Sequence, residues 1–174
     1  MSNFKDTLSN DRARGVLTVN TTRKSTGEVT NFSEHNLVVQ MSNNILAGLM
    51  GGDLGCIDRI CLGNSPVTET LEDTTISLLD TDTLVMGDTQ EAGVNIAFTQ
   101  PMNSHEYLAP NIIQFNWEVG YNQANGIDIA EYGLCNTEGM MFSRKVRGRI
   151  EKTEDLALNG TWTIEFLPIE PIVL

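Results

Sequence analysis

The sequence contains few of the residues on which enzymes most often depend. Its 174 residues include two histidines, His35 and His105, and neither lies in a motif with a nucleophile. We therefore predict that both are structural. The glycines from Gly48 to Gly55 fit neither a phosphate-binding loop nor a dinucleotide fingerprint, because no Lys-Ser/Thr pair follows them. No paired acid–base motif is present, so we predict that the chain is not an enzyme.

Cysteine is also scarce. The three cysteines are Cys56, Cys61 and Cys135, an odd number at no recognised metal spacing, so we expect reduced thiols. Cys56 and Cys61 fall on one predicted strand with side chains on opposite faces, and they cannot share a metal. Acidic loops at residues 69–73 and 80–82, with Asp88, lack the spacing of an EF-hand loop. Their carboxylate oxygens could still bind a calcium ion, so a calcium site stays an alternative to a solvated acidic surface. We expect no cofactor.

Positive charge and long apolar runs are lacking as well. The chain has 11 basic and 23 acidic residues and a net charge of -12, which repels nucleic acid and anionic lipid. No apolar run approaches the roughly 18 residues of a membrane span, and the first residues contain no apolar signal segment. These features predict a protein made in the cytoplasm with neither a nucleic-acid nor a membrane partner.

What the sequence does contain is a series of strand-like segments and one helix. Apolar residues that recur at every fourth position predict an amphipathic helix over residues 36–50. Ser33 or Asn36 would cap its start, and Gly51-Gly52 would end it. Alternating apolar and polar residues predict strands at 15–20, 28–32, 56–62, 94–99, 113–119, 127–135, 140–150 and 156–166. Residues 101–110 are predicted to be a loop, and residues 74–88 a loop with a short strand or helical turn. Strands at this spacing are typical of an antiparallel β-sandwich of jelly-roll or Ig-like type.

The length suits one domain with flanking segments. Residues 1–13 are polar and predicted to be an N-terminal arm, residues 14–167 form the sandwich, and residues 168–174 form an extended C-terminal tail containing two prolines and terminal aliphatic residues. The predicted core consists of apolar residues on the helix stripe and on the inward faces of the strands. They are Leu37, Met41, Ile45, Leu49, Phe115, Trp117, Phe142, Trp162, Ile164 and Phe166.

The segment 140–152 reverses the sign of the local charge. In an extended strand, Ser143, Lys145, Arg147 and Arg149 share one face, while Arg144 joins the apolar face. The cationic row is either a solvated sheet face or a set of ion pairs with an acidic surface, such as the acidic loops of a second copy. The hypothetical subunit interface comprises the basic residues and the last aliphatic ones: Arg144, Lys145, Arg147, Arg149, Lys152, Ile172, Val173 and Leu174.

The order of these segments resembles a family of small virion structural proteins of tailed bacteriophages. The matching pieces are the helix 36–50, Ile57 to Asn64, Glu131 to Leu134, Gly139 to Arg144, Ile150 to Lys152, and Leu156 to Phe166. The resemblance covers about residues 30 to 167. It implies a β-rich subunit of a ring or trimer and carries no catalytic residues. Cys135, where a bulky apolar residue is more typical, and the proline-rich end depart from the pattern.

We therefore expect a non-enzymatic structural subunit of a phage virion, in the tail, baseplate or fibre attachment, made in the host cytoplasm. Its expected partners are further copies of itself and other virion structural proteins. One alternative is a capsid decoration or head-fibre protein. A second is a carbohydrate-binding module, because β-sandwiches often stack Trp and Tyr rings on sugars. Trp117 and Trp162 fall on core-facing patterns, while Tyr107 and Tyr121 lie in predicted loops. An enzyme built from widely separated carboxylates is the third.

Overall fold

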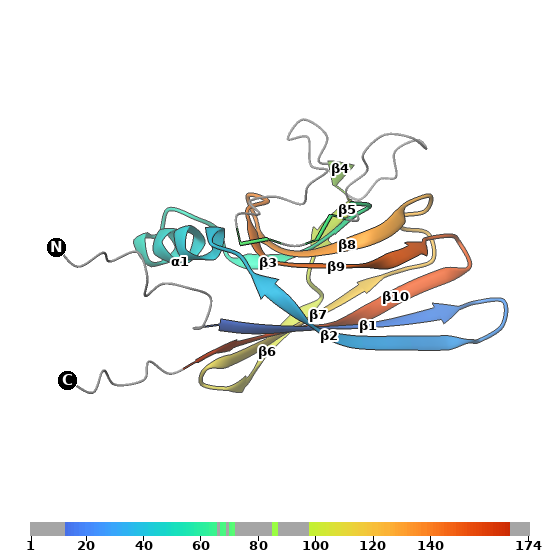
Figure 1. Cartoon of the computed structure of the whole chain (residues 1–174), viewed down its shortest axis with the longest axis horizontal. Helices are drawn as coiled ribbons and strands as arrows, with labels where there is room; N and C mark the ends of the chain where they lie inside the picture. Colours follow the sequence, from blue (N-terminus) through green and yellow to red (C-terminus); the bar gives the residue numbers. More distant parts are fainter. Residues whose placement is uncertain (1–12, 66, 69, 72–84, 87–97, 168–174) are drawn as a thin grey trace.

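A computed structural model describes residues 13–65, 67–68, 70–71, 85–86 and 98–167 (Figure 1). One helix and ten strands occur in these ranges. They are β1 (Ala13–Arg23), β2 (Val29–Val38), α1 (Met41–Gly51), β3 (Ile57–Gly63), β4 (Val85–Met86), β5 (Phe98–Pro101), β6 (Ser104–Ala109), β7 (Ile112–Val119), β8 (Asp128–Asn136), β9 (Met141–Glu151) and β10 (Leu156–Phe166). Within the described ranges, no helix combines the length and the apolar character needed to cross a membrane.

The strands form one sheet in the order β4-β5-β3-β8-β9-β2-β1-β10-β7-β6. Every pairing is antiparallel except β4 with β5. The sheet curls into a half-barrel, so that the half containing β3, β5, β8 and β9 lies over the half containing β1, β10, β7 and β6 (Figure 1). The predicted mainly β, antiparallel fold with one helix is therefore confirmed.

Strand β2 connects the two halves of the curved sheet, because it pairs with a strand of each half. Its residues 29–36 pair with β1, whereas Leu37 and Val38 pair with Arg144 and Ser143 of β9. This pairing corrects the predicted start of the helix. Leu37 satisfies its backbone groups in the sheet, and α1 begins at Met41, without a side-chain cap from Ser33 or Asn36. The predicted end is right, since Gly52 closes the helix in the left-handed conformation with φ of 76°.

One further segment, residues 101–110, differs from the prediction. The predicted loop at 101–110 contains β6, whose residues from Ser104 to Ala109 pair with β7. Of the strand predicted at 94–99, only Phe98 and Thr99 lie among the described residues, and both belong to β5. The segment 74–88 and both acidic loops fall almost wholly outside the described residues, as do the N-terminal arm and the tail 168–174.

The core fills the space between the two halves of the sheet. Aromatic rings meet across it: Tyr132 of β8 lies 5.9 Å from Phe32 of β2 and 6.5 Å from Trp117 of β7, measured between ring centroids. Most of the predicted core residues are buried, namely Ile45, Phe115, Trp117, Phe142, Trp162 and Ile164. Leu37, Met41 and Leu49 are half-buried. Phe166 is instead 36% exposed, because it ends β10 at the open end of the half-barrel.

Candidate interaction site

Basic side chains of strand β9 form ion pairs with strand β2 of the same chain. Lys145 Nζ lies 3.2 Å and Arg147 Nε 3.1 Å from the carboxylate oxygens of Glu34 on β2. The Arg147 guanidinium also stacks 3.7 Å from the centroid of the Phe32 ring, a cation–π contact. The cationic face of β9 is thus turned toward β2 of the same chain. Sequence periodicity identified the residues that share this face but not what the face meets.

Arg144 occupies the opposite face of β9 and is buried. Its Nε lies 2.5 Å from Glu131 on β8, and the two side chains are 1% and 0% exposed. Another guanidinium nitrogen donates to the Val67 carbonyl oxygen at 3.0 Å, which fixes the chain after β3. Arg144 was predicted to lie at a subunit interface, but its charge is used inside the fold.

The remaining residues of the hypothetical interface lie in different places. Lys152 is fully buried. Arg149 is exposed and lies 3.4 Å from Asp128 on β8. Ile172, Val173 and Leu174 lie outside the described residues. A basic interface would therefore depend on Arg149 and on the partly exposed Lys145 and Arg147.

Lys152 sits in a pocket of oxygen atoms after β9. Its ammonium donates to Asn125 Oδ1 at 2.8 Å, to the Thr153 carbonyl at 3.1 Å and to the Tyr121 carbonyl at 3.4 Å. Burial lowers the pKa of Lys152 from 10.5 to about 8. The folded chain therefore releases this proton at a lower pH than the unfolded chain does.

We expect the stability of the wild-type protein to rise between pH 8 and 10, because the unfolded chain then binds more protons at Lys152. The rise should be on the order of 2 kcal/mol in the free energy of unfolding. Lys152→Met should remove this component of the pH profile measured by urea unfolding, whereas Lys24→Met, at an exposed turn, should keep it. Identical profiles for Lys152→Met and the wild type would contradict the assignment.

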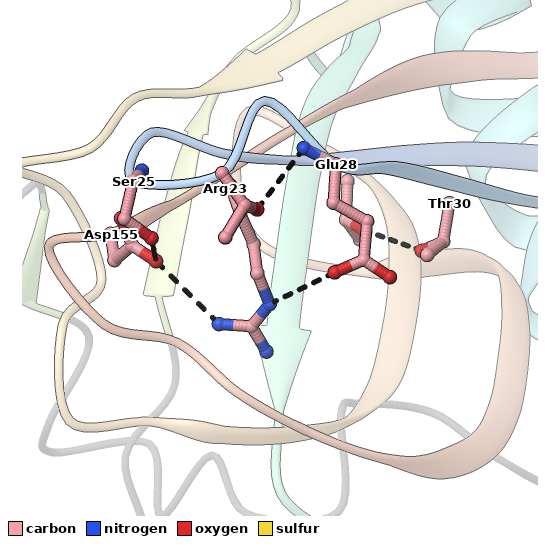
Figure 2. Close-up of polar contacts among 7 residues, drawn as sticks. Arg23, Ser25, Glu28, Thr30 and Asp155 are labelled. Carbon is pink, nitrogen blue, oxygen red and sulfur yellow. Dashed lines mark hydrogen bonds and ion pairs between the residues drawn. The ribbon is translucent and has the colours of Figure 1, made fainter.

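At the end of the half-barrel away from α1, polar contacts join two turns (Figure 2). Ser25 donates its backbone N–H and its hydroxyl to the Asp155 carboxylate, each at 2.7 Å. Arg23 lies between two acidic groups, 3.7 Å from Asp155 and 4.0 Å from Glu28. The Ser25 hydroxyl, followed by its backbone N–H, holds the pKa of Asp155 below its usual value. This cluster fastens the β1–β2 turn to the β9–β10 turn.

The opposite end of the half-barrel opens into an apolar cleft of about 380 Å³. One wall comprises Leu46 and Leu49 of α1, Ile57 of β3, Leu134 of β8 and Phe142 of β9; the other comprises His105 and Tyr107 of β6, Ile113 and Phe115 of β7, and Ile164 and Phe166 of β10. Cys56, Asp58, Pro110, Asn111 and Ile112 complete the lining. The cleft therefore lies between the two halves of the sheet, with α1 contributing to one wall.

The start of β1 and the end of β10 lie beside this cleft. Ala13, the first residue of β1, pairs with Phe166, the last residue of β10, and Phe166 lines the cleft. Tyr107 at the rim is 72% exposed, and its neighbour Leu108 is 54% exposed. An apolar cleft with exposed rim residues is typical of a binding surface.

Sequence reasoning missed this cleft because residues 101–110 were predicted to be a loop. The alternation of His105, Tyr107 and Ala109 was the available signal for a strand. It also missed that Cys61 and Cys135 meet in one buried cluster with Val39 and Met141. A shared hydrogen bond with Cys61, together with burial, raises the pKa of the Cys135 thiol. Cys56 is the exposed member of the three cysteines and lines the cleft.

Among the described residues there is no group of three or more His, Cys, Asp or Glu side chains placed to hold a metal ion. We compared the chain with models of protein families, with curated proteins and with solved structures. None of the three comparisons finds a match.

Proposed function

We propose that this chain is a non-enzymatic structural subunit of a bacteriophage virion, in the tail, baseplate or fibre attachment, that assembles with copies of itself. The observation that carries the self-assembly is the apolar cleft at the end of the half-barrel where residues 13 and 166 are paired. The virion assignment rests on the sequence resemblance. We take the two facing halves of the sheet as an antiparallel β-sandwich of jelly-roll or Ig-like type. A capsid decoration or head-fibre protein would use the same cleft.

The cleft supports assembly better than the basic strand does. Glu34 and Asp128 lie within ion-pair distance of the more exposed basic residues of β9, inside the same chain. Apolar side chains at the cleft, by contrast, have solvent-exposed surface that a second subunit can bury. Assembly through the cleft should therefore persist in high salt, which weakens exposed ion pairs but not apolar contacts.

The mass in solution tests this proposal. Light scattering should give a multiple of the 19.2 kDa chain at low and at high salt. Tyr107→Asp places a charge at the cleft rim and should shift the protein toward the monomer. Val29→Asp is the matched control, because Val29 is 62% exposed at the start of β2 and outside the cleft lining.

Two results would contradict assembly through the cleft. A monomer at every salt concentration would exclude self-assembly under these conditions. An oligomer that dissociates in high salt and is unaffected by Tyr107→Asp would instead indicate an interface formed by Lys145, Arg147 and Arg149.

Glycan binding is the second candidate function, and Tyr107 favours it. Its exposed ring lies 5.9 Å from the His105 ring, beside the cleft, and can stack on a sugar. Trp117 and Trp162 are 2% and 0% exposed and are not accessible for stacking. Binding on a glycan array that Tyr107→Ala abolishes would support this function, whereas binding unchanged by Tyr107→Ala would exclude Tyr107 as the stacking residue.

A further inference from the structure

We infer that the apolar cleft binds the segment Leu167 to Leu174 of a second copy of the chain. This inference rests on the proposed self-assembly and names the part of the subunit that makes the contact. Three features carry it: the chemistry of the cleft, the sequence of the segment, and the point at which the chain leaves the fold.

The cleft calls for an apolar occupant. Aliphatic and aromatic side chains from both halves of the sheet make up most of its lining, and its volume of about 380 Å³ is within the range of binding pockets. The segment reads Leu-Pro-Ile-Glu-Pro-Ile-Val-Leu, so five of its eight residues are aliphatic. Burying these side chains in the cleft would remove apolar surface from water on both partners.

The path of the chain favours a second copy over the same one. Phe166 lies on the wall of the cleft, so a segment that follows it would have to reverse its direction to enter the same cleft. The segment contains two prolines and no Gly, Asn or Asp, a composition that favours an extended conformation. Extended, the seven residues after Leu167 span about 23 Å, enough to reach a neighbouring subunit.

An extended segment also finds backbone partners at the cleft. Strand β6 is last in the strand order and, within the described residues, pairs only with β7. Its outer edge can therefore accept an additional strand, while alternate side chains of that strand enter the cleft. This mode combines main-chain hydrogen bonds with apolar burial.

Cys56 provides a native probe of the cleft. It is exposed on the cleft lining, whereas Cys61 and Cys135 are 1% and 0% exposed, so a maleimide reagent should label Cys56 in the folded protein. In the full-length Leu174→Cys variant, a short bismaleimide should join the introduced C-terminal thiol of one copy to Cys56 of another and give covalent dimers and larger species. The matched control is Cys56→Ser with Leu174→Cys, in which the only accessible thiols are the introduced ones. It can form at most dimers linked through two introduced thiols, and peptide mapping should find no link at position 56.

A second measurement follows the protection of Cys56. The full-length variant Ile172→Asp/Leu174→Asp should react with maleimide about tenfold faster at Cys56 than the wild type does, as expected if the segment occupies the cleft about nine-tenths of the time. Thermal unfolding should give the same midpoint for both proteins, so that faster labelling is not a consequence of misfolding.

Two results would overturn the inference. Cross-linking confined to single chains would show that each chain fills its own cleft. Equal labelling rates, together with no link through Cys56, would show that the segment does not occupy the cleft. If light scattering still gave an oligomer in either case, the proposed self-assembly would stand and only this contact would be wrong.

Discussion

Replacing Arg144 by methionine should lower the free energy of unfolding by about 3–5 kcal/mol, the usual cost of removing one partner of a buried ion pair. Arg144 and Glu131 are 1% and 0% exposed, and their nearest charged atoms are 2.5 Å apart. Methionine fills part of the volume but cannot compensate the carboxylate of Glu131. It also removes the donor to the Val67 carbonyl oxygen.

The double variant Glu131→Leu/Arg144→Met separates the cost of the charge from the cost of packing. Removing both charges should recover most of the stability that Arg144→Met loses, because a well-packed apolar pair often replaces a buried ion pair without loss. Arg149→Met is the surface control and should change stability by less than about 1 kcal/mol, since the Arg149–Asp128 pair is exposed. Chemical denaturation measures all three variants. For Arg144→Met, a loss of less than about 1 kcal/mol, the size expected of an exposed pair, would contradict this account.

The sequence predicted the strands well where one face of the strand is buried. In β7 and β10, Trp117 and Trp162 alternate with polar residues, and that alternation follows directly from burial of one face against the core. The gap between the strands predicted at 127–135 and 140–150 also matches the structure, because a turn joins β8 to β9 there and Gly139 adopts a φ of 82° that glycine readily takes.

Pairings between distant segments were not readable. Periodicity placed Lys145 and Arg147 on one face of β9 but gave no sign that this face turns toward Glu34, which lies far earlier in the chain. For the same reason the helix was predicted to begin at residue 36 rather than at Met41. Leu37 fits a helical stripe, and only its pairing with Arg144 in the sheet places it in β2. Tertiary pairing overrides local periodicity at both points.

The candidate site was even less accessible from the sequence. The cleft draws its walls from α1 and from strands between β3 and β10, and no single segment carries a signature of it. Several lining residues, such as Leu49 and Phe115, were predicted to be core residues, and the aliphatic residues that follow β10 were recognised as needing burial, but no pattern brought the two sets together. The cleft proposed to bind these aliphatic residues lies beside Phe166, the last residue of β10.

Replacing Gly160 by alanine should cost about 3 kcal/mol, at the upper end of what overpacking usually costs. Gly160 lies in β10 between Val19 of β1 and Trp117 of β7. A Cβ atom there would collide with the Thr18 carbonyl oxygen and lie 2.9 Å from Trp117 Cζ2. Neither neighbour can yield easily, because one is backbone in a sheet ladder and the other is a buried indole ring.

Gly148→Ala is the matched control within the same sheet. Gly148 lies in β9, and a Cβ atom added there meets no other atom within 4 Å. Its stability should stay within about 0.5 kcal/mol of the wild type, as for other surface substitutions. Urea unfolding followed by tryptophan fluorescence suits both variants, since the contact at risk involves Trp117. If Gly160→Ala proved as stable as Gly148→Ala, β1, β10 and β7 would not pack as closely as this structure requires, and the register that places Gly160 between Val19 and Trp117 would have to be revised.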